Sequence, residues 1–481
     1  MKKNTIYLTM FIALALCLAA CGNSHKDGKG SVREVMSQAK AEQQENIENS
    51  SKAQAAVRDA GKEQKDAEEE QERRRLELKS ALVEKISVGD SAEEKATFAE
   101  WLTNAYELEQ LELIDFSKDV DRQLYDVTGK SIHVLWDTSL GHLENEETAA
   151  EHAIYLREVN DTKVDMAFAG DLCLTEDGYV IDHYDALGGD IGSCLSEKIM
   201  DRLNGADISM LNHEYPVSKR GAALEGKYYT FRASPKREKI LQQMGIDIVS
   251  LANNHIYDFG TNAFLDTLDA LGKAEIPYVG AGADKKEAAR PVYFVVGGIK
   301  IGFVAANRSE KYIFTPEAGK DSPGVVRMYD TAKMNKIIKK ARRQCDYLIA
   351  YVHWGTENSK YYEAYQTNIA KEFFSSGADA IIGSHPHVLQ GIGYVDGKPV
   401  VYSLGDFWFN GETKYTTVVN LEVTTDGLAE LSVLPCIQKG YETHYISKKS
   451  KQKDFYEYLR ELSPGVSIDE NGVVTVEKEH E

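Results

Sequence analysis

Cysteine is scarce in this chain of 481 residues. The sequence has six cysteines, and no two of them form a CxxC pair or the close spacing of a zinc ribbon. This usage argues against a disulfide scaffold and against a cysteine-rich zinc site. Two of the six, Cys17 and Cys21, lie within and directly after an N-terminal apolar segment. The other four are predicted to be small, buried, apolar side chains: Cys173, Cys194, Cys345 and Cys436.

Positive charge is also in short supply. The chain has 56 lysines and arginines against 76 aspartates and glutamates, which gives a formal net charge of −20. Such an excess of acid argues against nucleic acid as a partner and against broad adhesion to anionic lipid. It also makes a polyanionic substrate awkward unless bound cations offset the charge. The apolar fraction of 42% is ordinary for a globular protein with a sizeable core.

Long apolar runs are rare, and no run after the first is long enough to span a bilayer. The first, at residues 6–18, follows two lysines and ends in small residues, which predicts an export signal over residues 1–20. Leu18-Ala19-Ala20-Cys21-Gly22 resembles the lipobox of bacterial lipoproteins. The resemblance implies lipidation of Cys21 and an extracytoplasmic protein anchored to the cell membrane by acyl chains. A plain signal peptide with a chance cysteine is the alternative.

Apolar residues are sparse between residues 21 and 80, where Glu, Lys, Gln, Ala and Arg dominate. Three glutamates at 68–70 precede three arginines at 73–75, close to the spacing of helical ion pairs. The segment is predicted to be a charged low-complexity tether, either disordered or a solvated helix. It is either a spacer across the cell wall or a linker without a specific role.

A helical region is predicted for residues 81–160. Ser91 and Glu94 have the spacing of a capping box. Residues 132–143 mix strand-like and turn-like residues and receive no assignment. Apolar residues recur at helical spacing after the cap and are expected to form a packing surface: Phe98, Trp101, Leu102, Ala105 and Leu108.

Short β-runs alternate with helical stretches from residue 164 to residue 440. This texture predicts an α/β layered domain with its functional site at strand ends. Residues 441–481 are predicted to be a polar C-terminal tail with one helix at 453–462. The predicted strands are 164–174, 208–211, 246–251, 292–296, 300–305, 346–352, 378–382, 399–403, 416–423 and 429–434, and the predicted helices are 235–244, 261–273, 331–343 and 363–374.

Two histidines follow one of these apolar runs. The run ends at Gly383, and His385 and His387 come next, two residues apart. Alternate side chains of an extended backbone project to one side, so both imidazoles are expected to face one point just past the strand. Two neutral imidazoles at this spacing suit a transition-metal site, although loop histidines without a ligand have the same pattern.

Similar polar residues follow several other predicted strands, and this recurrence favours the metal hypothesis. Loops at one edge of a sheet converge, so the groups can assemble one pocket. A mixture of Asp, Glu, Asn and His suits Mn, Fe or Zn, and a carboxylate can bridge two ions. The motifs are Ala169-Gly170-Asp171, Asn212-His213-Glu214, Ala252-Asn253-Asn254-His255 with Asp258, His353-Trp354-Gly355 with Glu357, and Leu404-Gly405-Asp406-Phe407.

Together with Gly383-Ser384-His385-Pro386-His387, these motifs resemble the CapA family of poly-γ-glutamate capsule synthesis proteins, over about residues 164–434. The resemblance implies a four-layer αββα metallophosphatase sandwich with a site for one or two divalent ions. It also implies that His255 is the catalytic proton donor or charge stabiliser. By the same resemblance, Asp171 and His387 bind the first ion, Glu214 bridges, and the second ion is bound by Asn254, His353 and His385.

The chain departs from the family pattern at two positions. Metallophosphatases commonly have a histidine two residues after the first aspartate, where this sequence has Cys173. Either the first ion is held weakly or not at all, which we favour, or a thiolate replaces the histidine. Asp406 replaces the asparagine of the usual Leu-Gly-Asn-Phe motif. Its carboxylate either attracts a cation or caps a turn.

Four further residues are candidates to orient the ligands or to contact the substrate. Asn253, Asp258 and Glu357 lie beside ligand motifs and can hold histidines in place. The two acids can equally be helix caps or surface groups. Arg232 can bind an anionic group of the substrate, or it can form a surface salt bridge.

The sequence therefore predicts a lipid-anchored extracytoplasmic protein that acts in the synthesis, export or remodelling of an anionic capsule polymer. By resemblance this polymer is poly-γ-glutamate, and the chemistry is metal-assisted hydrolysis or transfer. Membrane-bound synthase subunits are possible partners. The alternative is a non-catalytic scaffold that binds metal and polymer within a synthase complex, and a third hypothesis is a phosphatase or nucleotidase unrelated to capsule.

Overall fold

A computed structural model gives the fold of residues 32–157, 159, 162–176, 178–309 and 314–477. The predicted signal peptide and the predicted lipidation residue Cys21 lie outside these residues. The chain divides into two compact units, the first ending at Leu76 and the second beginning at Glu77. Among the described helices, none combines the length and apolar character needed to cross a membrane.

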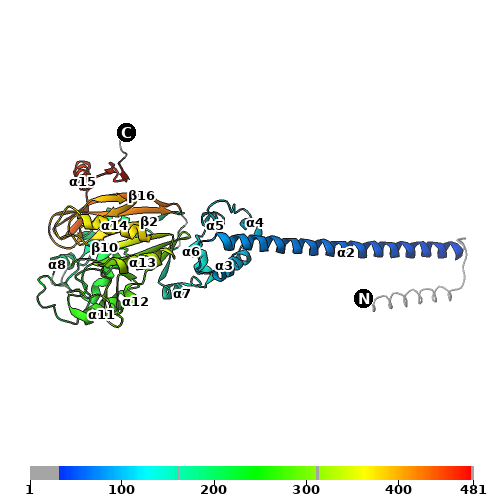
Figure 1. Ribbon diagram of the computed structural model, residues 1–481, viewed down its shortest axis with the longest axis horizontal. Coiled ribbons are helices and arrows are strands. Elements are labelled where there is room, and N and C mark those ends of the chain that lie inside the picture. The colour runs from blue at the N-terminus through cyan, green and yellow to red at the C-terminus, as the bar shows by residue number, and fades with distance from the viewer. Residues whose placement is uncertain (1–31, 158, 160–161, 177, 310–313, 478–481) are drawn as a thin grey trace. The chain divides into compact units, whose positions relative to one another are not determined.

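The charged low-complexity segment forms one uninterrupted helix, α2 (Val32–Lys85), as Figure 1 shows. Its composition explains the helix, because Ala, Glu, Gln, Lys and Arg are all strong helix formers. Ion pairs one turn apart add to it, such as Lys52 with Glu48 at 2.8 Å. The side chains of residues 37–74 are exposed, so this stretch is a solvated helix.

A small helical bundle with its own apolar cluster follows. The predicted capping box is present: the Ser91 side chain accepts a hydrogen bond from the Glu94 backbone, and Glu94 bonds back to Ser91. Phe98 and Leu102 are buried against Leu82. Residues 132–143, which have no clear sequence signal, begin with a helix. The helices are α3 (Ala92–Ala105), α4 (Leu108–Leu111), α5 (Val120–Thr128), α6 (Ile132–Ser139) and α7 (Glu146–Glu151).

Two large sheets form the centre of the second unit. The first has the strand order β1-β7-β8-β10-β11-β13-β12, and the second β17-β16-β15-β2-β3-β4-β5, with β14 paired to β2. The strands of the first are β1 (Ile154–Arg157), β7 (Val292–Val296), β8 (Ile299–Asn307), β10 (Tyr347–His353), β11 (Ala380–Ser384), β13 (Lys398–Val401) and β12 (Ile392–Val395). Those of the second are β17 (Glu442–Tyr445), β16 (Gly427–Lys439), β15 (Lys414–Thr424), β2 (Val164–Leu172), β3 (Ile208–His213), β4 (Ile248–Ser250), β5 (Tyr278–Val279) and β14 (Asp406–Trp408).

The sheets pack face to face, and helices cover both outer faces. Phe168 of β2 and Phe303 of β8 meet between the sheets, with ring centroids 6.5 Å apart. On β2 the alternate residues Ala167 and Ala169 face outward, as the two-residue period of a strand requires. Helices α8 (Tyr179–Ala186), α9 (Glu197–Asn204), α10 (Glu238–Gln243) and α11 (Gly260–Lys273) cover the second sheet, and α12 (Lys285–Ala288), α13 (Ala332–Arg342) and α14 (Ala364–Ser376) cover the first.

The observed layers are therefore helices, sheet, sheet and helices, which confirms the predicted four-layer αββα sandwich. Short elements complete the sandwich. Strand β6 (Ala281–Gly282) pairs with β9 (Gly324–Val325), and short 3₁₀ helices lie at Ile191–Ser193 and Pro235–Arg237. In the second sheet β2 is parallel to β3 and antiparallel to β15, and β3 is parallel to β4; in the first sheet β10 is parallel to both β8 and β11. Their carboxyl ends position the site described below.

The chain beyond residue 440 differs from the predicted polar tail. β17 extends the second sheet, and β18 (Val466–Ile468) pairs with β19 (Val474–Val476). Helix α15 (Lys449–Glu461) buries Phe455 and Leu459 in the core between the sheets. These two apolar residues are one helical turn apart within a strongly charged segment, so a reading of overall composition underestimates how firmly the segment packs.

Candidate metal centre

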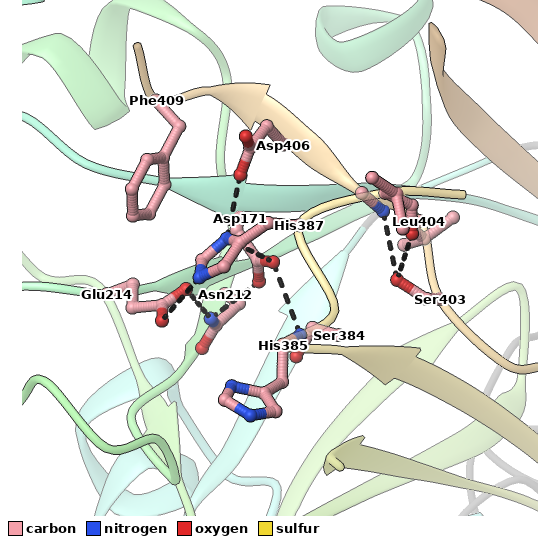
Figure 2. Close-up of polar contacts among 12 residues, drawn as sticks. Asp171, Asn212, Glu214, Ser384, His385, His387, Ser403, Leu404, Asp406 and Phe409 are labelled. Carbon is pink, nitrogen blue, oxygen red and sulfur yellow. Dashed lines mark hydrogen bonds and ion pairs between the residues drawn. The ribbon is translucent and has the colours of Figure 1, made fainter. Parts of the chain in front are cut away.

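The six predicted metal ligands gather at the carboxyl ends of five strands from the two sheets. Five of the six, all except Asn254, fall with Asp406 into two groups, and within each group the ligand atoms all lie within 4.8 Å of one another. One group is Glu214, His353 and His385, and the other is Asp171, His387 and Asp406. Figure 2 shows Asp171, Glu214 and His387 directed toward a common point from separate elements. The sequence therefore brings distant strand ends into one cluster.

Asp171 is placed by an irregularity in β2. The pairing of β2 with β3 shifts register between Phe168 and Asp171, and such bulges commonly re-aim a side chain beside an active site. Gly170 permits the close approach of the next loop, because a Cβ there would lie 2.0 Å from the Gly405 carbonyl oxygen. The same carbonyl accepts a hydrogen bond of 3.0 Å from the Asp171 backbone. The Ala169-Gly170-Asp171 motif thus has a steric basis.

The first group is centred on His387. Its Nδ1 lies 2.8 Å from Asp406 Oδ1 and 3.6 Å from Asp171 Oδ2, and its Nε2 lies 3.9 Å from Glu214 Oε1. Asp406 also binds Lys414, whose Nζ is 3.1 Å from Oδ2. The carboxylate that replaces the family asparagine is therefore already engaged by two cation-forming groups.

Cys173 is not part of either group. Its side chain is buried in the apolar cluster outside the second sheet, and burial raises the pKa of the thiol well above its usual value. A neutral thiol is a poor metal ligand. Of the alternatives for this position, the structure therefore favours an apolar cysteine over a thiolate ligand.

The residues of the second group fit a bound cation. His353 Nε2 lies 2.7 Å from Asn254 Oδ1 and 3.5 Å from Glu214 Oε1. Within the described residues, Glu214 Oε1 and His385 Nδ1 are buried and have no hydrogen-bond partner. Buried polar atoms without partners are rare, and a bound cation accounts for both. Two imidazoles, an amide oxygen and a carboxylate suit a divalent transition metal.

Asn212 belongs to the site, although the sequence prediction did not include it. Its amide nitrogen donates to Asp171 Oδ1 at 2.8 Å and to Glu214 Oε2 at 3.0 Å, and its oxygen accepts from Asn253 at 3.0 Å. Asn212 therefore holds both acids in register. Its position two residues before Glu214, on the same side of an extended strand, was the available signal.

The backbone of the His385–His387 segment differs from the prediction. Both histidines have positive φ, 99° for His385 and 57° for His387, whereas an extended strand was expected. The ring centroids are 6.1 Å apart, and each ring joins a different one of the two groups, but a nitrogen of each also lies within 4.8 Å of the other beside Glu357, so the two imidazoles do approach a common point. Strand β11 ends at Ser384, and the chain must turn sharply to deliver both imidazoles. Such conformations cost about 1–3 kcal/mol each and concentrate at functional sites.

Burial controls the protonation of the ligand groups in the metal-free protein. Desolvation raises the pKa of Asp171 to about 6 and that of Glu214 well above its usual value, with Asp171 as a further cause for Glu214. Desolvation lowers the pKa of His353 and of His385 well below the usual value, which keeps both imidazoles neutral and able to ligate. For His387 burial acts downward, but the carboxylates of Asp406, Glu214 and Asp171 raise its pKa to about 10.

We expect metal binding to release protons and to strengthen as the pH rises through neutrality. Near neutral pH the metal-free site holds a proton on His387, and below pH about 6 also on Asp171, while burial favours the protonated form of Glu214. A metal ion must displace them, so each released proton makes the affinity change about tenfold per pH unit. Calorimetric titration with Mn²⁺ in two buffers of different ionisation enthalpy measures the protons released. An affinity that is flat across this pH range would contradict the assignment.

His255 lies beside the two groups and is held by a chain of buried polar contacts. Its Nδ1 is 2.8 Å from Asp258 Oδ2, and Lys227 Nζ is 2.8 Å from the other oxygen of Asp258. Asn253 Oδ1 accepts hydrogen bonds from the backbone of His255 and of Ile256. Desolvation lowers the pKa of His255. With Nδ1 engaged by Asp258, Nε2 is the nitrogen left for proton exchange.

The remaining predicted residues lie at the rim of the site. Exposed Glu357 has a carboxylate oxygen within 4.8 Å of nitrogens of His385 and His387. Arg232 lines an adjoining cavity of about 980 Å³, together with His255, His387 and Glu357. Asp258 is buried and orients His255, so it is neither a helix cap nor a surface acid. The cavity gives the metal groups and His255 common access to a ligand.

Fold and site together define a four-layer αββα sandwich with two adjacent groups of side chains at its strand ends whose donor atoms suit a divalent metal. Residues 165–411, just over half of the chain, match the family model described as bacterial capsule synthesis protein PGA_cap. The chain belongs to this family.

Relatives and solved structures are similar to this chain to different extents. The capsule biosynthesis protein CapA of Bacillus anthracis is 29% identical over 273 residues, which cover 55% of this chain and 66% of that protein, just under two thirds. The PGA biosynthesis protein CapA of Bacillus subtilis is 26% identical over 331 residues, 68% of this chain and 85% of that protein. The NAD nucleotidase structure from Haemophilus influenzae aligns over 64% of each chain with 14% identity and a TM-score of 0.32, too low to support an inference.

Proposed function

We propose that this protein acts outside the cytoplasm in the synthesis, export or remodelling of an anionic capsule polymer, through metal-assisted hydrolysis or transfer. Family membership supports the link to capsule, and the names of the Bacillus relatives connect them to capsule and PGA biosynthesis. The polymer we propose is poly-γ-glutamate. The lipobox-like sequence at Cys21 supports attachment to the cell membrane, where synthase subunits would be partners.

The observation that carries the catalytic part of the proposal is His255. A protein that only bound metal and polymer would have no need of a neutral buried imidazole beside the ligand groups. Here Asp258 holds that imidazole by Nδ1, and the ring lines the cavity that His387 also lines. The arrangement is typical of a general acid–base group oriented by a carboxylate.

Different residues of this chain would bind the metal, exchange a proton and position the ligands. One or two ions, of Mn, Fe or Zn, would be held by Glu214, His353, His385 and Asn254 and by Asp171, His387 and Asp406. Bound ions would supply positive charge that acidifies water and stabilises charge developing on the scissile group. His255 exchanges a proton at Nε2. Asn212 holds the carboxylates of Asp171 and Glu214 in position through its two hydrogen bonds. The polymer would reach the site through the adjoining cavity.

The alternative is a non-catalytic scaffold within a synthase complex. Lys414 favours it, because its ammonium occupies an oxygen of Asp406 and so weakens the first ligand group. A single ion in the second group would still let the protein bind polymer. Such a protein would lack the second metal ion with which two-metal hydrolases stabilise the attacking and leaving oxygens.

Metal analysis and turnover separate the two functions. We expect the full-length protein to contain at least one divalent ion and to cleave poly-γ-glutamate or a generic phosphodiester in a metal-dependent manner. Chelation should abolish cleavage, and the same metal should restore it. A metal-loaded protein that binds the polymer but cleaves neither substrate would leave the scaffold function and overturn the catalytic one.

A further inference from the structure

The cavity next to the metal centre has a cationic rim in an otherwise acidic protein. Lys219, Arg232 and Lys236 line it, and among the described residues none of the three has an ion-pair partner. The acids of the lining are mostly engaged elsewhere. Glu176 pairs with Arg237, and Glu412 pairs with Lys414 at 2.6 Å. With a chain charge of −20, this local surplus of positive charge is selective for an anionic ligand.

Arg232 is the best positioned of these cations. Its guanidinium carbon lies 4.1 Å from the centroid of the Phe259 ring, a cation–π contact. Its Nη1 contacts two backbone carbonyl oxygens, of Arg220 and Gly221, at 3.4 Å each. These contacts fix the planar group without using a carboxylate. The remaining N–H donors are therefore available to a ligand.

The neighbouring Arg237 shows what a structural arginine looks like in this fold. Its guanidinium is buried and pairs with Glu176 at 2.8 Å and with Asp185 at 2.6 Å. All of its strong donors are thus satisfied by the protein itself. Arg232 comes from the same segment, and within the described part of the chain no acid pairs with it. We take this difference as the sign of a binding role.

Aromatic side chains line the same cavity as Arg232 and contact the histidines of the site. The Phe231 ring is 4.3 Å from the His255 ring and 5.5 Å from the Phe409 ring, and Phe409 is 4.7 Å from His387. The cavity lining therefore combines apolar rings beside His255 and His387 with the cations Lys219, Arg232 and Lys236. A ligand that carries both methylene groups and carboxylates fits this lining.

We propose that Arg232 is a carboxylate-binding subsite that positions the polymer for reaction, by clamping the carboxylate of a unit next to the reacting one. The planar fork of an arginine matches a carboxylate with two parallel hydrogen bonds. Lys219 and Lys236 then bind further carboxylates less specifically along the rim. The inference rests on the proposed function, because it assumes a polymer of carboxylate-bearing units.

Binding to short oligomers tests the subsite without relying on turnover. We would compare a fluorescent γ-linked glutamate oligomer with the matching oligomer of γ-linked isoglutamine, in which each free α-carboxylate is an amide, on full-length Mn²⁺-loaded protein. The wild type should prefer the carboxylate oligomer, and Arg232→Gln should weaken its binding about 10- to 100-fold with little effect on the amide oligomer. Arg232→Lys, which keeps the charge but loses the fork, should fall between.

Arg220→Gln is the matched control. Arg220 lies on the same loop, is exposed and already pairs with Asp266, with its Nε 2.9 Å from Oδ2. It does not line the cavity, so its loss should leave oligomer binding unchanged. A wild type that discriminates and an Arg232→Gln variant that discriminates equally would overturn the subsite alone. A wild type that binds neither oligomer, or both alike, would overturn the subsite and the proposed polymer together.

Discussion

Replacing Glu214 with glutamine is expected to abolish tight divalent-metal binding, and with it the stabilisation that metal gives the wild-type protein. Glu214 is buried, belongs to one ligand group and reaches toward His387 of the other, so it is the acid that joins the two. A glutamine fills the same space but cannot supply a negative charge. At a metal concentration 100 to 1,000 times Kd, the wild type should gain about 3–4 kcal/mol that the variant lacks. Thermal unfolding with and without chelator measures this.

The same variant should have the opposite effect on the metal-free protein. Burial raises the pKa of Glu214 on folding, so the protonated acid stabilises the folded state at low pH. That contribution is lost as the pH rises through the folded-state pKa, whereas a glutamine has none to lose. Metal-free Glu214→Gln should therefore be at least as stable as metal-free wild type in alkaline solution. A variant that is equally destabilised with and without metal would show that Glu214 has only a packing role.

Glu238→Gln supplies the control for removing a buried carboxylate. Glu238 is buried and, within the described residues, neither of its oxygens has a hydrogen-bond partner. It lies at the start of α10, outside both ligand groups. Its replacement should change the stability of the protein but leave the metal-induced increase in unfolding temperature intact.

The sequence predicted which residues form the site better than it predicted the backbone conformation that positions them. Asp171, Glu214 and His353 could be located because polar residues after apolar runs are unusual, and parallel strands bring their ends together. The resemblance to the CapA family implied which of these residues are ligands, and the strand-end pattern that located them needed only residue types and spacing. It could not foresee that His385 and His387 would turn through positive φ, because that conformation is imposed by the loops packed around them.

Contacts between distant segments were the other part that the sequence did not reveal. Asn212 is an ordinary strand residue until Asp171 and Asn253 are placed beside it. Lys227 looks like one more surface lysine, yet it is buried against Asp258. In the same way, the apolar residues of α15 are too few to stand out from a charged sequence, although they complete the core between the sheets. Local sequence patterns therefore identify the metal ligands well, but they do not identify the residues that hold those ligands in place.

Replacing His255 with alanine is expected to reduce turnover by about 10²- to 10⁴-fold while the metal content stays unchanged. His255 contributes no atom to either ligand group, so its loss removes the proton-exchanging Nε2 and leaves the ion binding intact. Asp258→Asn should act in the same direction, because it removes the acceptor that fixes His255 through Nδ1. Steady-state kinetics with metal analysis of each variant measures both quantities. A His255→Ala variant without metal would make His255 a ligand instead.

His444→Ala is the control that separates loss of proton transfer from the general effect of removing a histidine that pairs with a carboxylate. His444 also pairs with a carboxylate, its Nε2 lying 2.8 Å from Glu442, but it is on β17 and far along the sheet order from the ligand strands. Its removal should leave turnover unchanged. If His255→Ala behaved like His444→Ala and kept full activity, any reaction would have to proceed without this imidazole. The carboxylates and ions alone would then carry the chemistry, and the buried Lys227–Asp258–His255 chain would be structural.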